Sequence, residues 1–217
     1  MGLAIESRIA LTTDLLAHDL LAHERTLPLA ESFADLFPED GLVRGRTLTC
    51  TGPAATSLAL ALLAPVVAAG SWLGIVDVPT VGLDAASEFG LPLERVVAIN
   101  REQEGGEEAE KHWSQRWPDV MAAAVDGFDV LLARVPAGVR PSAVRKLATR
   151  VRQRGAVVVV LGDPGPTTCD GVLHGEPIGW SGVGDGYGYL QQRAVTVQAS
   201  GRRWPGHGRR ELLLPAS

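Results

Sequence analysis

Residues 47–63, TLTCTGPAATSLALALL, place a glycine and two hydroxyl side chains between a β-prone run and an apolar helix. A loop in this position can bind phosphate, because its backbone N–H groups and a Ser or Thr hydroxyl then face the phosphate and its magnesium ion. The full pattern, GxxxxGK[ST], also requires a lysine for the β- and γ-phosphates. Here Gly52 and Pro53 run through two alanines into Thr56 and Ser57, and no lysine occurs in the first hundred residues.

This degenerate P-loop is also about two residues shorter than the pattern requires, as though Gly-Lys had been deleted. A shorter loop offers fewer N–H groups to a phosphate, and we expect no residue to replace the charge of the lysine. We therefore expect Thr56 or Ser57 to cap the following helix rather than to bind magnesium. The loop predicts no bound cofactor.

Two aspartates follow predicted strands, at the edge where open α/β sheets bind ligands. Asp77 and Asp163 could each belong to a polar site, but we favour the interpretation that each caps the turn after its strand. The five histidines show no ligand spacing, the two cysteines match no zinc or redox pattern, and no G-x-S-x-G elbow occurs. We therefore expect neither a metal site nor a catalytic triad.

Strand and helix patterns alternate from residue 47 onward, and this alternation predicts the fold. Near-continuous apolar strands separated by helices are typical of a mainly parallel sheet covered by helices on both faces. Residues 189–199 instead alternate polar and apolar, as antiparallel edge or hairpin strands do. The predicted strands are 47–52, 71–78, 96–100, 128–135, 156–162 and 189–199, and the predicted helices are 56–69, 82–90, 108–125 and 141–154.

Residues 3–25 have the pattern of an amphipathic helix, which we expect to dock on a partner or on the core of the chain. His18 and His23 each follow an aspartate by four residues, and we favour helix-surface pairs with those carboxylates over a metal site. The predicted domains are an N-terminal helix and connector (1–40), an α/β core (41–199) and a basic C-terminal tail (200–217).

Composition indicates a packed globular protein, since 46% of the residues are hydrophobic and 21% are charged. The net charge of -5 gives no overall attraction to nucleic acid. The N-terminus lacks the apolar stretch of a signal peptide. The longest apolar run, residues 58–69, is interrupted by Pro65 and is too short to span a membrane. We expect a cytoplasmic protein without membrane contact.

Basic residues are concentrated between residues 134 and 155, where seven cations occur without a carboxylate. Apolar positions of the helix predicted at 141–154 form one stripe, so its arginines should line the exposed side. Such a face suits phosphates or an acidic partner, and a merely solvated face is the alternative. An acidic patch around Gly105 and Gly106 would repel DNA. The candidate partner-binding residues are Arg145, Lys146, Arg150, Arg152, Arg154, Arg202, Arg203, Arg209 and Arg210.

Four blocks in order, FPEDGLVRGR, TLTCTGPAATSLALALL, VDVP and EFGLPLERVV, resemble the start of the RecA ATPase core. In that core a Gly-Leu-x-x-Gly block leads into a strand and a Gly-Pro P-loop. Within the superfamily, the chain is similar to the actinobacterial ImuA-prime proteins, the degenerate RecA-like group sometimes labelled SulA-like. The resemblance covers about residues 30–199 and implies a RecA-like fold.

The resemblance also assigns two catalytic positions. RecA-type enzymes carry a water-activating glutamate just after the second strand, where this chain has Pro79. Their Walker B strand ends in an aspartate that supports magnesium, where this chain has Arg134. Asp129 stands at the start of that strand, which is the wrong end for ligands. With the lysine also missing, we expect no ATP hydrolysis and no enzymatic activity.

What the resemblance implies is an accessory role in the SOS response to DNA damage, in translesion mutagenesis. ImuA-prime proteins belong to a mutasome with ImuB, a Y-family-like protein that has lost polymerase activity, and an error-prone C-family DNA polymerase. ImuB links that assembly to the sliding clamp. We expect this chain to bind an ImuB-like protein and to make at most a weak contact with single-stranded DNA. Two alternatives stay open: a SulA-like inhibitor of cell division acting on FtsZ, and a nucleotide-binding ATPase in which Thr56, Ser57 and Asp77 suffice.

Overall fold

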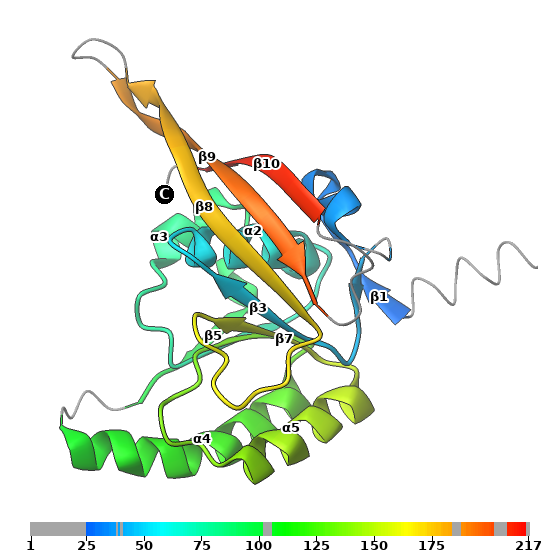
Figure 1. The fold of residues 1–217 in the computed structure, drawn as a ribbon, viewed down its shortest axis with the longest axis vertical. Helices are drawn as coiled ribbons and strands as arrows, with labels where there is room; N and C mark the ends of the chain where they lie inside the picture. Colours follow the sequence, from blue (N-terminus) through cyan, green and yellow to red (C-terminus); the bar gives the residue numbers. More distant parts are fainter. Residues whose placement is uncertain are drawn as a thin grey trace, which may run out of the picture.

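The computed structural model describes residues 25–37, 39, 41–101, 106–183, 188–201 and 208–215. Within this part of the chain, eight strands form one sheet in the order β10-β9-β8-β3-β7-β6-β4-β5 (Figure 1). The strands from β5 to β8 pair in parallel, and β9 and β10 add to β8 in antiparallel. Their bounds are β3 (Thr47–Thr51), β4 (Leu73–Val76), β5 (Val96–Ile99), β6 (Val130–Ala133), β7 (Val157–Leu161), β8 (Gly171–Val183), β9 (Gly188–Ser200) and β10 (Gly208–Pro215).

Helices cover both faces of the sheet. α2 (Ala55–Ala68) and the short α3 (Leu83–Glu88) lie on one side, and α4 (Glu107–Gly127) and α5 (Pro141–Arg154) pack side by side on the other (Figure 1). A single-turn 3-10 segment, η2 (Leu93–Arg95), leads into β5. The expected RecA-like, mainly parallel sheet with helices on both faces and an antiparallel C-terminal extension is therefore confirmed.

The continuous apolar strands are explained by this two-sided cover. Val157 and Val159 of β7 pack in the core that contains α2, whereas Val158 and Val160 pack in the core under α4 and α5. Because successive side chains of a strand point to opposite faces, a strand buried on both faces must be apolar at every position. α4 contributes Trp117 to the second core, where it is 2% exposed.

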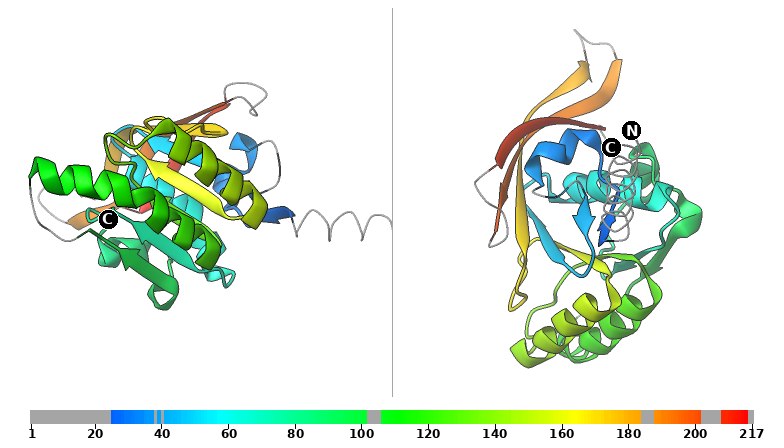
Figure 2. Two further views of the ribbon diagram at one scale, coloured as in Figure 1. Left: turned by 90° about the horizontal axis from the view of Figure 1, so that it is seen from below. Right: turned by 90° about the vertical axis from the view of Figure 1, so that its right-hand side faces the viewer.

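Two strands of the eight-stranded sheet were not predicted. β8 contains several glycines, which disfavour strand formation, yet it pairs with β3 and β9. β10 occupies residues 208–215 of the segment expected as a basic tail, and its Leu212 and Leu214 are buried. The β8–β9 hairpin extends beyond the rest of the sheet (Figure 2). This part of the C-terminal segment therefore belongs to the sheet.

The segment expected as a connector also belongs to the core. β1 (Thr26–Leu27) pairs with β2 (Leu42–Val43), and a 3-10 helix, η1 (Glu31–Leu36), lies between them. Phe33 is 1% exposed, so this segment is anchored by apolar packing. The helix predicted over 3–25, with His18 and His23, lies outside the described residues except for Arg25. Within the described residues, none of the helices has the length and apolar character that a membrane crossing requires.

Candidate functional site

The shortened loop turns the chain from β3 into α2 at Gly52. Gly52 has a φ of 84°, a conformation that residues with a Cβ seldom adopt. A Cβ at this position would lie 2.5 Å from the carbonyl oxygen of Gly175 on β8. The glycine is therefore required by two constraints, the left-handed turn and the close approach of β8. Neither constraint involves a phosphate.

Two N–H groups of the loop, those of Ala54 and Ala55, are used within the protein. Ala54 donates to the carbonyl oxygen of Gly175 at 3.2 Å, and Ala55 donates to the carbonyl oxygen of Gly52 at 3.1 Å. Gly175 approaches so closely that a Cβ on it would lie 2.5 Å from Leu58 of α2. In a phosphate-binding loop, amides of this kind point at the anion instead. Here β8 packs directly over the loop and over the first turn of α2.

The prediction that a hydroxyl caps α2 is wrong. The N-cap residue is Ala54, and no side chain makes a capping hydrogen bond. α2 begins at Ala55, earlier than predicted, so Thr56 and Ser57 lie inside the first turn instead of before it. Ser57 is buried and Thr56 is half-buried. A capping hydroxyl must precede the helical residues to reach their N–H groups, and neither residue does.

A hydrogen-bonded chain that the sequence analysis missed joins the ends of β3 and β8. Thr51 Oγ1 lies 3.0 Å from His174 Nδ1, and His174 Nε2 lies 2.9 Å from Glu176 Oε1. The order hydroxyl, imidazole, carboxylate is that of an activated nucleophile. The loop N–H groups of Ala54 and Ala55 are already engaged, so they offer no oxyanion site beside it. The chain therefore serves to tie β3 to β8.

A cation, Arg193, contacts the backbone of the loop. Arg193 of β9 donates from Nη2 to the carbonyl oxygen of Pro53 at 3.4 Å. Its guanidinium also lies over the ring of Trp180, 4.9 Å from the centroid. Arg193 therefore does not replace a phosphate-binding lysine, because its contacts are to the loop backbone and to an aromatic face of the hairpin.

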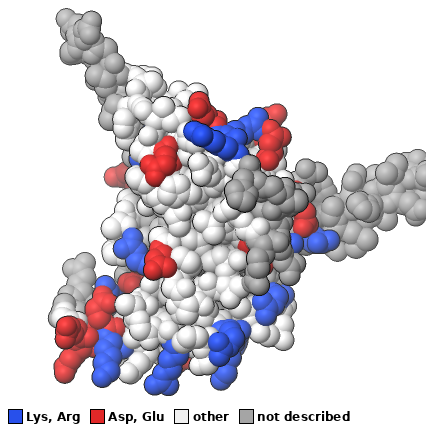
Figure 3. Space-filling view, viewed as in Figure 1, with Lys and Arg blue, Asp and Glu red and all other residues white. Residues whose placement is uncertain are grey.

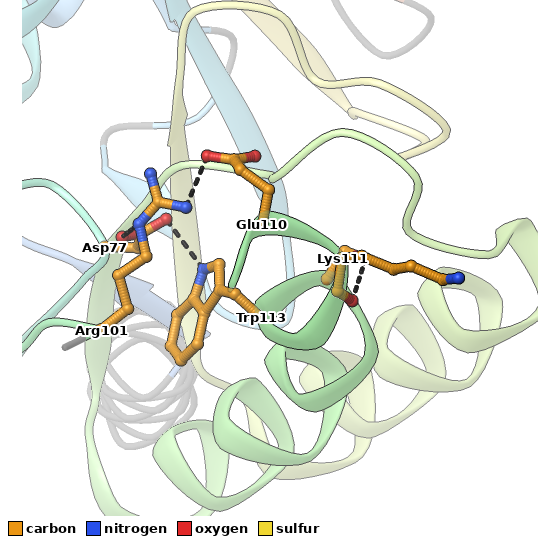
Figure 4. Close-up of polar contacts among 6 residues, drawn as sticks. Asp77, Arg101, Glu110, Lys111 and Trp113 are labelled. Atoms are coloured by element: carbon orange, nitrogen blue, oxygen red, sulfur yellow. Dashed lines mark hydrogen bonds and ion pairs between the residues drawn. The ribbon is translucent and has the colours of Figure 1, made fainter. Parts of the chain in front are cut away.

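Asp77 lies at the carboxyl edge of the sheet and is 5% exposed. Its Oδ2 accepts a hydrogen bond from Trp113 Nε1 at 2.8 Å, and its Oδ1 lies 3.4 Å from Arg101 Nε (Figure 4). Arg101 also pairs with Glu110 on α4 at 2.5 Å. The interpretation that Asp77 caps the next turn is therefore wrong. The Asp77 carboxylate instead connects the end of β4 to α4 through Trp113, and to the segment after β5 through Arg101.

Burial raises the pKa of Asp77 above its ordinary value, and the neighbouring Arg101 charge and the Trp113 hydrogen bond offset part of this rise. Asp163 behaves as predicted, since its Oδ1 accepts a hydrogen bond from Gly165 N–H at 2.8 Å and so caps its turn. Among the described residues, no group of three or more His, Cys, Asp or Glu side chains could hold a metal ion.

The two positions assigned by the RecA resemblance lie at the same edge. Pro79 is exposed in the turn after β4, and Arg134 is exposed directly after β6, where its N–H donates to Val76 at 3.2 Å. Arg134 is close enough for its charge to lower the pKa of Asp77 slightly against the effect of burial. Asp129 lies at the opposite end of β6, where it accepts from the N–H of Trp72. A cation and a proline thus occupy the edge where two carboxylates would be expected.

The basic face of α5 is partly neutralised by α4. Arg150 donates to both carboxylate oxygens of Asp126, and Arg154 Nε donates to the same carboxylate at 2.8 Å. These pairs lower the pKa of Asp126 to about 2, with Arg150 as the main cause. The sequence count missed this carboxylate because Asp126 lies outside the basic segment. The predicted buried stripe of α5 is present, with Leu147 among its buried members.

The other candidate cations have different surroundings. Arg145, Lys146 and Arg152 are exposed and form no ion pair among the described residues. Arg209 and Arg210 are exposed on β10, and Arg210 pairs with Asp35 of η1. Figure 3 shows blue side chains along the lower edge of the molecule, where Figure 1 places α4 and α5. Arg202 and Arg203, as well as Glu102 and Glu104 of the predicted acidic patch, lie outside the described residues.

The chain is similar to known proteins in sequence and in fold. Residues 35–167 match the protein family described as the MT3502 N-terminal domain. No curated protein matches the chain. Among solved structures, the chain is similar to a RadB recombinase, with a TM-score of 0.56 and 15% sequence identity over 82% of this chain and 92% of that one. At this identity the likeness shows the fold alone.

Proposed function

The chain belongs to the MT3502 N-terminal domain family, and from this premise we propose that it is a RecA-like accessory protein without catalytic activity. Its proposed role is damage-induced (SOS) translesion mutagenesis in the cytoplasm. There it binds an ImuB-like Y-family protein, which connects it to an error-prone C-family DNA polymerase and the sliding clamp. The recombinase-like fold and the resemblance of residues 30–199 to ImuA-prime proteins support this proposal.

The observation that carries the non-catalytic part is the hydrogen bond from Ala54 N–H to Gly175 O. A P-loop binds phosphate through unengaged N–H groups, and this one is engaged by a strand of the same sheet. Replacing that hydrogen bond would require β8 to move away from Leu58, against which Gly175 is tightly packed. The loop therefore acts as a packing element that joins β3, α2 and β8.

The carboxyl edge supports the same proposal. A water-activating base and a magnesium-supporting carboxylate are replaced by Pro79 and Arg134, and neither can accept a proton or bind a cation. The remaining carboxylate, Asp77, is engaged by Trp113 and Arg101. A protein that keeps a recombinase-like sheet without this chemistry is expected to act by binding other proteins.

The test is co-expression of the full chain, carrying an affinity tag, with an ImuB-like protein from the same organism. The expected result is retention of that protein in equal amounts in magnesium–ATP and in EDTA, because no nucleotide is needed. The tag alone is the control. Retention of FtsZ in place of the ImuB-like protein would replace the proposal with the cell-division alternative. Retention of the ImuB-like protein that requires ATP would overturn the proposal that this chain acts without a nucleotide and without catalysis.

A further inference from the structure

A groove runs along the outer side of α4 and α5. It consists of two adjoining hollows of about 820 and 860 Å³. Both hollows are lined by Pro118 and Asp119 of α4 and by Arg140 and Ala143 at the start of α5, so the groove is continuous. Its lining residues come mainly from α4 and α5, which lie at the lower edge of Figure 1.

The floor of the groove is apolar where the two helices meet. Pro118 and Ala122 of α4 face Ala143 and Leu147 of α5 across the second hollow. Pro118, Ala122 and Ala143 are half-buried and Leu147 is buried, and the two small alanines leave room for another element to approach the helix backbones. A groove of this kind fits the apolar stripe of a third helix.

The rim of the groove is mainly basic. Five cations and two carboxylates line the two hollows. Asp126 engages Arg150 and Arg154, whereas Arg140 and Lys146 form no ion pair among the described residues. Lys111 likewise forms no ion pair among the described residues, so the unpaired positive charge of the groove lies at Lys111, Arg140 and Lys146. The five cations are Lys111, Arg140, Lys146, Arg150 and Arg154, and the two carboxylates are Glu110 and Asp119.

We propose that this groove is the docking site for an acidic amphipathic helix of the protein partner, with Arg140 and Lys146 binding its carboxylates and Ala143 and Leu147 receiving its apolar stripe. The identity of the partner rests on the proposed function. The bidentate guanidinium of Arg140 suits a carboxylate, and a mainly positive rim speeds the encounter with a negative segment.

The same observations disfavour single-stranded nucleic acid as the occupant. Asp119 lines both hollows and Glu110 lines one end, so a continuous phosphate backbone would pass two carboxylates. None of the residues lining the two hollows is aromatic, so bases would find no ring on which to stack. A helix places its charges at intervals and can avoid Asp119, which a polyphosphate cannot.

The test compares charge reversals inside and outside the groove on one helix. Arg140→Glu/Lys146→Glu reverses the two unpaired cations of the second hollow, and Arg145→Glu/Arg152→Glu makes the same change on exposed residues that line neither hollow. A third variant, Ala143→Trp, fills the floor without changing the charge. Each full-length variant is titrated with the purified ImuB-like protein. In a separate titration in the same buffer, it is mixed with a dT oligomer of about 30 nucleotides.

The expected result is a loss of partner affinity of at least about tenfold for the groove pair and for Ala143→Trp, with a change of less than about threefold for the control pair. Reversing the acidic residues of the partner segment should restore binding to the groove pair. Equal partner binding by all variants overturns the groove and leaves the proposed function standing. No partner binding by the unaltered chain overturns both. Loss of dT binding alone in the groove variants overturns the protein occupant.

Discussion

Trp113 on α4 donates a hydrogen bond from Nε1 to Oδ2 of Asp77 at 2.8 Å, and both side chains are buried. Asp77 has a φ of 54°, the left-handed conformation that Asn, Asp and Gly adopt most readily. This contact fixes α4 to the end of β4 at the edge of the sheet where related folds place their chemistry. A carboxylate at the ligand-binding edge of the sheet is thus part of the packing.

Substitution of Asp77 should separate its hydrogen bond from its charge. Asp77→Asn keeps an acceptor for Trp113 and tolerates the positive φ, so its stability at neutral pH should equal or exceed that of the unaltered protein. Asp77→Ala leaves a buried N–H without an acceptor, which costs about 1–3 kcal/mol, and adds about 1–2 kcal/mol of backbone strain. Urea unfolding midpoints at neutral pH measure both. An equally stable Asp77→Ala protein would contradict this account.

The pH dependence of Asp77 follows from the direction of its pKa shift. Burial raises the pKa of the folded carboxyl, so the unfolded chain releases its proton first as pH rises. Stability is therefore lost as pH rises from about 4, the ordinary value, to the raised pKa. Asp77→Asn should lack this loss, and its advantage over the unaltered protein should grow from acid to neutral pH. Urea titrations across that range measure the difference, and a constant difference would refute the shift.

Asp126 should show the opposite dependence. Its pairs with Arg150 and Arg154 lower its pKa to about 2, so they stabilise the fold above the ordinary carboxyl pKa. That contribution is lost as pH falls from about 4 to about 2. Asp126→Asn should be less stable near neutral pH, and the gap should close over this acid window. The effect should be modest and salt-sensitive because the pairs are partly exposed. Asp119→Asn, on the same helix, is the matched control, because Asp119 forms no ion pair among the described residues.

The packing of β8 on the loop can be tested with two alanines on one strand. At Gly175 a Cβ would lie 2.5 Å from Leu58, whereas at Gly179 no atom lies within 4 Å. Gly175→Ala should therefore cost about 1–3 kcal/mol by overpacking, and Gly179→Ala should change little. Thermal unfolding of both variants measures this. Equal stabilities would mean that β8 does not press on α2.

Restoring the missing lysine should not restore nucleotide binding. Insertion of Gly-Lys after Thr56 rebuilds the GxxxxGK[ST] pattern, but Gly175 still accepts the hydrogen bond of Ala54 N–H. Neither the unaltered chain nor this variant should show a thermal shift with magnesium–ATP, or ATP turnover above background. Turnover of the unaltered chain that disappears in Thr56→Ala or Ser57→Ala protein would defeat the prediction.

Removal of the N-terminal residues should test their role without disturbing the core. Leu27 is buried and β1 pairs with β2. A chain that begins at Glu31 would lose β1, so the shortened chain must begin at Arg25. We expect it to fold with unchanged stability but to bind the partner more weakly or to be less soluble. Equal partner affinity and solubility would show that residues 1–24 are dispensable for both.

Local patterns were sufficient to predict most of the sheet and helices. α5 was predicted within its observed bounds, because Pro141 stands at its first turn and Gly155, with a φ of 71°, ends it. The apolar runs of β6 and β7 likewise identify strands buried on both faces. The RecA-like order of elements also follows from these patterns, since it depends on residues adjacent in the chain.

The sequence by itself therefore determined the succession of elements and the absence of a lysine from the loop. Only the tertiary structure decided what the polar groups do. Ala54 meets Gly175, Thr51 meets His174, and Asp126 meets Arg150 through contacts between distant segments. Each of these contacts depends on strand register or helix packing, which no local pattern specifies. The glycine-rich β8 is the clearest case, because its strand conformation comes from pairing with its neighbours and opposes its own propensity.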